Sequence, residues 1–113
     1  MLLAAMASCA APTPDADGRW FGTLTPAPAK PGCDASRASL VLRRTVVLFT
    51  PDEGTWTLEG HAAPDGSLTA ERSGAGANKQ PFATAFNGQV TPAGINGTYT
   101  TPRCTFSVAL HPP

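Results

Sequence analysis

Hydrophobic and polar residues alternate along much of this chain, with the period of two that is typical of β-strands. The alternation is clearest in residues 104–110, where Cys104, Phe106, Val108 and Leu110 share one face of the expected strand. Because one face is apolar and the other polar, we expect such strands to bury one side and expose the other.

Seven segments carry this pattern, or the β-branched and aromatic residues that favour extended structure. They are residues 19–25, 39–50, 55–61, 68–72, 82–86, 95–101 and 104–110. The second segment is long enough for two strands, and Arg43-Arg44 within it marks a bend, a bulge or a hairpin. The sequence therefore predicts seven or eight strands.

Turn residues separate these segments. Residues 51–54, 64–67 and 91–94 each contain a proline and a glycine, and we expect each of them to turn the chain. The glycine- and alanine-containing stretch 73–80 is expected to be a mobile loop. Asn87-Gly88 is expected to turn or bulge the strand that begins at Phe82.

The composition agrees with an all-β protein. The chain of 113 residues is long enough for one domain, and its 12 prolines and 11 glycines leave little room for a long helix. Eight basic and eight acidic side chains cancel, and no basic cluster exceeds Arg43-Arg44. Because nucleic-acid partners select a basic face, a nucleic-acid partner is not expected.

The N-terminus carries an export signature. Leu2 to Ala7 form an apolar run that ends in small residues, as the end of a secretory signal does, and it is too short to cross a membrane. No basic residue precedes it, so we expect the true translation start to lie upstream. We assign residues 1–8 to a signal-peptide remnant.

The segment Met6-Ala7-Ser8-Cys9 resembles the lipobox of bacterial lipoproteins, although Met6 stands where that family usually has Leu. The resemblance implies that Cys9 is lipidated and begins the mature chain, with residues 9–17 as a flexible tether. Ala10 follows where an Asp would retain the protein in the inner membrane. The resemblance therefore implies an outer-membrane anchor on the periplasmic side of the envelope. The alternative is an ordinary cleaved signal and a secreted protein.

Two cysteines remain if Cys9 carries lipid. An even pair in an exported domain is most simply a disulfide, so we expect a bond between Cys33 and Cys104. This bond would tie the last strand to the loop after the first. It favours a small antiparallel up-and-down barrel, formed by residues 18–113, over the alternative β-sandwich.

Gly18-Arg19-Trp20 resembles the Gly-x-Trp signature at the start of lipocalin- and avidin-like barrels. In those families the Trp closes one barrel end and a late Arg packs across it. The resemblance implies a structural pair of Trp20 and Arg103. It transfers no ligand-contacting residue to this chain.

No catalytic, metal-binding or cofactor-binding constellation is recognised in the sequence, and we expect no enzyme. His61 and His111 lack metal-ligand spacing, and the acidic pair Asp52-Glu53 is expected to lie in a turn. We also expect Trp56, Phe82, Phe86, Tyr99 and Phe106 to lie in the barrel core.

The function favoured by these observations is that of an envelope lipoprotein, anchored in the membrane by lipid, that acts as a non-catalytic binding or interaction module with a protein partner. One alternative is an inhibitor of exported proteases or lysozymes that uses the tether of residues 10–17. Another is a carrier of a small apolar ligand, which requires an open interior. A barrel of about 95 residues usually fills its interior with its own side chains.

Overall fold

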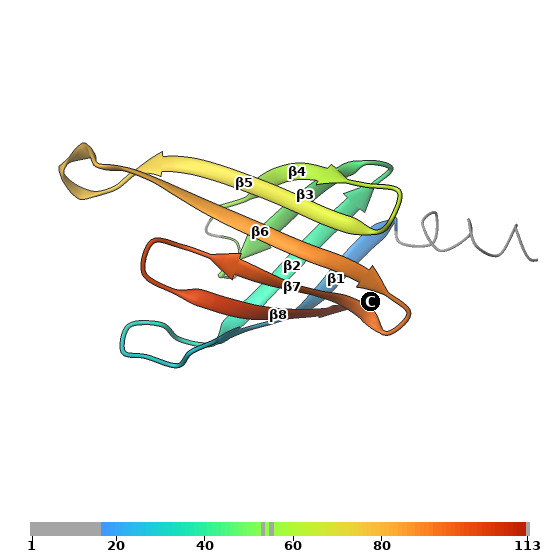
Figure 1. Ribbon diagram of the computed structural model, residues 1–113, viewed down its shortest axis with the longest axis horizontal. Coiled ribbons are helices and arrows are strands. Elements are labelled where there is room, and N and C mark those ends of the chain that lie inside the picture. Colours follow the sequence, from blue (N-terminus) through green and yellow to red (C-terminus); the bar gives the residue numbers. More distant parts are fainter. Residues whose placement is uncertain (1–16, 53, 55, 113) are drawn as a thin grey trace, which may run out of the picture.

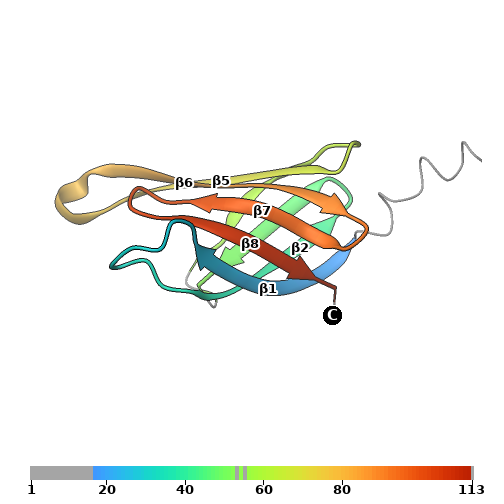
Figure 2. The same ribbon diagram turned by 60° about the horizontal axis from the view of Figure 1, so that its bottom comes forward.

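The computed structural model describes residues 17–52, 54 and 56–112. Within them eight antiparallel strands follow one another as a meander, and β1 pairs with β8 to close the sheet into a barrel (Figure 1 and Figure 2). The strands are β1 (Gly18–Pro26), β2 (Ser36–Arg43), β3 (Val46–Pro51), β4 (Leu58–Ala62), β5 (Ser67–Ala75), β6 (Pro81–Thr91), β7 (Gly94–Thr100) and β8 (Thr105–His111). The predicted up-and-down barrel is confirmed over the sandwich.

The interior of the barrel is filled by apolar side chains from every strand. Phe49 and Phe86 stack at its centre, with ring centroids 4.3 Å apart, and Tyr99 packs against Phe49 at 5.5 Å. Both phenylalanines are fully buried. Of the five aromatic residues predicted for the core, Phe86, Tyr99 and Phe106 are buried, whereas Trp56 and Phe82 are half-buried at one end.

Three predicted turns are confirmed among the described residues, and the long apolar segment 39–50 is divided. Arg44, with φ of 58°, turns β2 into β3, so the Arg43-Arg44 pair marks a hairpin. Asn87-Gly88 neither turns nor bulges the chain, and that prediction was wrong. Both residues lie in the middle of β6, where Gly97 faces Gly88 across the ladder, so the two strands approach closely without side chains between them.

The predicted loop 73–80 is the largest difference from the sequence-based expectation. Strand β5 continues to Ala75, β6 starts at Pro81, and only the 3-10 turn η1 (Ala77–Lys79) and its two flanking residues connect them. Strand β4 pairs with β5 only as far as Glu71, and β7 pairs with β6 only as far as Ala85. Residues 72–84 therefore leave the barrel as a two-stranded projection, which we call the arm (Figure 1).

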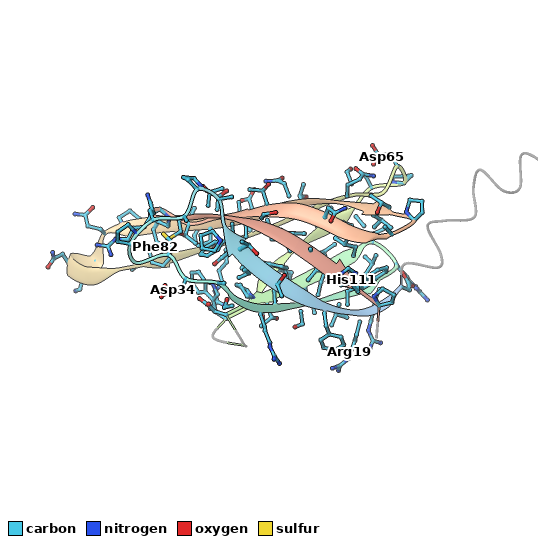
Figure 3. The ribbon with its side chains drawn as sticks, turned by 90° about the horizontal axis from the view of Figure 1, so that it is seen from below. Arg19, Asp34, Asp65, Phe82 and His111 are labelled. Carbon is cyan, nitrogen blue, oxygen red and sulfur yellow. A yellow bond between two sulfur atoms is a disulfide. The ribbon has the colours of Figure 1, made fainter. Side chains whose placement is uncertain are left out.

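The meander gives the barrel two unlike ends. At the turn end, the connections between described strands are residues 44–45, 63–66 and 92–93, and the chain enters the barrel at Gly18 and leaves it after His111. At the loop end the connections are residues 27–35, 52–57, the arm and 101–104. Figure 3 shows Arg19 and His111 towards the turn end, with Asp34 and Phe82 towards the loop end.

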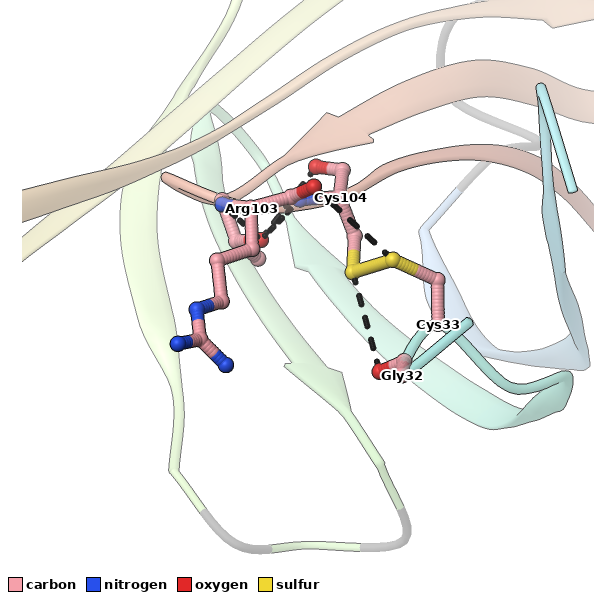
Figure 4. Close-up of a disulfide and its surroundings, with 5 residues drawn as sticks. Gly32, Cys33, Arg103 and Cys104 are labelled. Carbon is pink, nitrogen blue, oxygen red and sulfur yellow. Dashed lines mark hydrogen bonds between the residues drawn. A yellow bond between two sulfur atoms is a disulfide. The ribbon is translucent and has the colours of Figure 1, made fainter. Parts of the chain in front are cut away.

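The predicted disulfide is present at the loop end. Cys33 and Cys104 are joined with a Cα–Cα distance of 5.8 Å and are 71 residues apart in sequence. Cys33 lies in the β1–β2 loop and Cys104 directly precedes β8, so the bond ties the first connection to the last (Figure 4). Because β1 and β8 are also the strands whose pairing closes the barrel, the bond reinforces that closure.

Candidate functional site

The base of the arm gathers side chains that the sequence keeps far apart. Trp56 comes from the β3–β4 loop, Arg72 from β5 and Phe82 from β6. The rings of Trp56 and Phe82 lie 5.5 Å apart, and the Arg72 guanidinium lies 4.8 Å from the centre of the Trp56 ring. Arg72 also donates a 3.3 Å hydrogen bond to the carbonyl of Thr57. We call Trp56, Arg72 and Phe82 the aromatic cluster.

Gly74 makes room for this cluster. It faces Phe82 across the ladder, and a side chain at this position would meet Phe82 at 3.1 Å and Trp56 at 3.2 Å. The absence of a side chain therefore lets the indole lie over the arm. Strand β4 starts only at Leu58, later than the expected strand 55–61, and Trp56 lies in the connection before it.

A hydrogen-bonded group beneath the cluster closes the loop end of the core. The Trp56 indole N–H donates to the Tyr99 hydroxyl, which also contacts the hydroxyl of Thr84. Thr84 is buried and donates to the carbonyl of Arg72 at 3.1 Å. Every buried side-chain nitrogen and oxygen in the described residues has a hydrogen-bond partner. The buried polar side chains described at the loop end thus satisfy one another or the backbone.

Burial sets the acidity of the tyrosine in this group. Loss of water around the phenol raises the pKa of Tyr99, the hydrogen bond from Trp56 opposes that rise, and the Asp52 carboxylate adds to it. Tyr99 therefore stays protonated at neutral pH and serves as a hydrogen-bonding partner.

A shallow depression lies beside the disulfide at the same end. It has a volume of about 380 Å³, and its walls include Lys30, Pro31, Pro102 and Arg103. Each disulfide sulfur lies against a backbone carbonyl across the bridge, Cys33 Sγ 3.8 Å from Arg103 O and Cys104 Sγ 3.9 Å from Gly32 O (Figure 4). The bridge therefore holds two basic side chains on neighbouring loops.

The implied pair of Trp20 and Arg103 is not formed. Trp20 is buried near the start of β1, at the turn end, whereas Arg103 is exposed in the β7–β8 connection at the loop end. In a meander the turn before the last strand lies at the end where the first strand finishes, so these two residues are at opposite ends. A different tryptophan, Trp56, caps the loop end.

The other candidate residues are dispersed over the surface. His61 is exposed on β4, and His111 is exposed at the end of β8. Asp52 is exposed and accepts a 2.9 Å hydrogen bond from Ser36, while Glu53 and Cys9 lie outside the described residues. No group of three metal-ligating side chains occurs in the described part of the chain. No helix among the described residues is long and apolar enough to span a membrane.

Neither the role of Arg72 nor the arm was predicted from the sequence. Leu68, Ala70 and Gly74 lie on one face of β5, and Phe82 and Phe86 continue that face on the return strand, although the exposed Arg72 interrupts the apolar series. That alternation was the available signal, and the small residues between 73 and 77 concealed it.

Comparison of this chain with protein-family models, with curated proteins and with solved structures gives no match. The geometry of the loop end therefore has to carry the functional argument by itself, together with the N-terminal sequence.

Proposed function

We propose that this protein is an exported, lipid-anchored protein of the bacterial envelope whose loop end binds a protein partner without catalysing a reaction. One observation carries the proposal: the projecting arm, with its aromatic cluster, lies at the end opposite to the one where the N-terminal segment enters the barrel. A chain held in a membrane through Cys9 would present this end away from its attachment point.

The chemistry of the loop end suits a protein partner. Trp56 and Phe82 are half-buried, so part of each ring remains available, and aromatic residues with arginine are the side chains most enriched at binding hot spots. Lys30, Lys79 and Arg103 supply exposed cations at the same end of the barrel. The arm is ordered by a regular ladder, so binding does not have to pay for folding it.

The interior of the barrel offers less support for a carrier of small apolar ligands. Its centre is occupied by the stacked rings of Phe49 and Phe86 and by fully buried aliphatic side chains. A ligand would have to displace these groups, at a cost comparable to that of a large core substitution.

The anchor is tested by the intact mass of the full chain, purified without reductant from the membranes of a bacterial host. We expect a chain that begins at Cys9, carries acyl groups and has lost two hydrogens at the Cys33–Cys104 bond. The variant Cys9→Ser should leave the membrane fraction. A wild-type chain without acyl groups would contradict the anchor.

The binding surface is tested with a photo-crosslinking amino acid placed at single positions in living cells. Phe82 and Lys79 probe the loop end, and Asp65, exposed in a turn-end connection, is the matched control. We expect a defined protein adduct from the loop-end positions only. Adducts from Asp65 of equal yield would contradict a binding surface at the loop end. An adduct with an exported hydrolase, together with its inhibition by the purified chain, would favour the inhibitor alternative.

A further inference from the structure

The outer face of β1, β2 and β3 next to the turn end differs from the rest of the barrel surface. Phe21 and Val46 point outwards and are 46% and 45% exposed, the two large hydrophobic side chains with such exposure among the described residues. Between them lie Val41 and Leu48, which face each other across the β2–β3 ladder and are only half-buried. Four apolar side chains thus form one outward patch.

Arginines surround this patch. Arg19 pairs with Val41, and Arg43 pairs with Val46, so each guanidinium starts from a position directly beside an apolar side chain. Arg44 lies in the adjoining turn, and all three are exposed. Half of the chain's six arginines therefore lie at one corner of the barrel. We call the apolar patch together with Arg19, Arg43 and Arg44 the arginine face.

Few opposing charges lie on this surface. Glu59 pairs with Leu48 from the side of β4 and is the carboxylate at the margin. Both oxygens of the Asp17 carboxylate accept the backbone N–H of Arg44 at 3.1 Å. His61 and His111 border the patch beside Val46 and Phe21, respectively. The centre of the face therefore combines cations with apolar groups.

The hydrogen bond of Asp17 also fixes where the N-terminal segment joins the barrel. It holds residue 17 against the β2–β3 turn, at the edge of the arginine face. A shallow depression of about 280 Å³ continues the face on the other side of Phe21, with Arg37, Ser39 and Thr50 in its walls. It is a place where a headgroup can lie between an aromatic ring and a guanidinium.

From these contacts we infer that the arginine face docks on the surface of an anionic lipid bilayer. The guanidinium groups bind lipid phosphates, the apolar side chains enter the boundary between headgroups and acyl chains, and the barrel rests on β1–β3. Basic side chains near an anionic leaflet add to a lipid anchor, which alone gives weaker attachment. The inference concerns the protein surface and does not depend on acylation of Cys9 or on a partner at the loop end.

The test uses the full chain carrying Cys9→Ser, so that no acyl group contributes, and sedimentation with two kinds of vesicle. One kind is pure phosphatidylcholine, and the other is an equimolar mixture of phosphatidylcholine and phosphatidylglycerol. We expect binding to the anionic vesicles that weakens as salt is raised. Adding Arg19→Gln and Arg43→Gln should weaken it roughly 30-fold, since each basic group near such a surface contributes about fivefold.

A matched control distinguishes the face from the net charge. Lys79→Gln with Arg103→Gln removes two cations from the loop end and gives the same net charge as the arginine pair. We expect this control to bind almost as the parent does, and Phe21→Ser to bind about tenfold more weakly. Equal losses in the two double variants, or equal binding to both kinds of vesicle, would overturn the inference. The C9S chain failing to bind anionic vesicles would overturn it as well. The intact mass of the wild-type chain reports separately on the anchor.

Discussion

The turn end and the loop end of this barrel are formed by the same eight strands but by different kinds of connection. At the turn end two residues suffice to reverse β2 into β3, and two more reverse β6 into β7. At the loop end the β1–β2 connection alone spans residues 27–35, and the β5–β6 hairpin projects beyond its neighbours. The short turns are held by local hydrogen bonds, such as that of Arg44 to Asp17 and those of Ser67 to Asp65, whereas the long connections are held by a disulfide, an aromatic cluster and buried hydrogen bonds. Connections as long as those of the loop end are not needed to close a barrel, and this difference is the reason why we propose the loop end as the binding surface.

Each end holds one of the chain's two tryptophans, so the ends can be compared by substitution. Trp20 is buried in the turn-end core, and Trp20→Ala should lower the free energy of unfolding by about 3–5 kcal/mol. Trp56 is half-buried outside a strand, and Trp56→Ala should cost only about 1–2 kcal/mol, with increased hydrogen exchange confined to the arm. Urea unfolding of both variants measures the difference. Equal costs would show that the arm is part of the global core.

Removal of the disulfide should act on the whole barrel through its loop end. Cys33→Ser with Cys104→Ser frees a segment spanning 71 positions, and the chain-entropy estimate for such a loop is about 4 kcal/mol. The free energy of unfolding of this variant, compared with that of the oxidised wild-type chain, measures the effect. The reduced wild-type chain is the control, and it should agree with the variant because both lack the same bond. A loss below about 1 kcal/mol would mean that strand pairing closes the barrel unaided.

Tyr99 reports on burial at the loop end, and it is the single tyrosine of the chain. Burial raises the pKa of Tyr99 in the folded state. The phenolate absorbance of the folded protein should therefore appear at a higher pH than that of the unfolded chain, whose tyrosine ionises near pH 10. Its contribution to stability is complete below that pH and is lost as the pH rises through the folded-state pKa. A titration midpoint equal to that of the chain in urea would contradict a sealed loop end.

The ionisation of Asp65 gives a corresponding test at the turn end, with a smaller expected effect on stability. Hydrogen bonds from the backbone and the hydroxyl of Ser67 lower the pKa of this exposed carboxyl. Its contribution is present above the ordinary carboxyl pKa and is lost as the pH falls through the lowered value. Asp65→Asn should therefore reduce the melting temperature slightly at pH 7 and leave it unchanged in strong acid. A reduction that persists in acid would indicate a role other than charge.

Local sequence patterns predicted the structure correctly where hydrogen bonding and burial depend on residues close together in the chain. The alternation of Phe106, Val108 and Leu110 predicted β8 and its buried face, and Pro64 with Gly66 predicted a turn at 64–67. The disulfide followed from counting cysteines. In each case the prediction depends only on a few adjacent residues or on the number of cysteines.

Local patterns failed where a distant side chain decides the conformation. The small residues around Gly74 are typical of a loop, yet Phe82 and Trp56 pack over that glycine and extend the ladder. Asn87-Gly88 has strong turn propensity, but pairing on both sides keeps β6 straight through it. The expected contact of Trp20 with Arg103 requires both residues to lie at the same end of the barrel. Their spacing along the chain does not reveal at which end each residue lies.

The sequence by itself determined the all-β class, the strand-and-turn order and the pairing of Cys33 with Cys104, because these depend on residue alternation, turn chemistry and the number of cysteines. Only the tertiary structure decided that the arm leaves the barrel, that Trp56 and not Trp20 caps the loop end, and that Arg19 and Arg43 gather around one apolar patch. Those features are contacts between strands, and register across a closed sheet sets them.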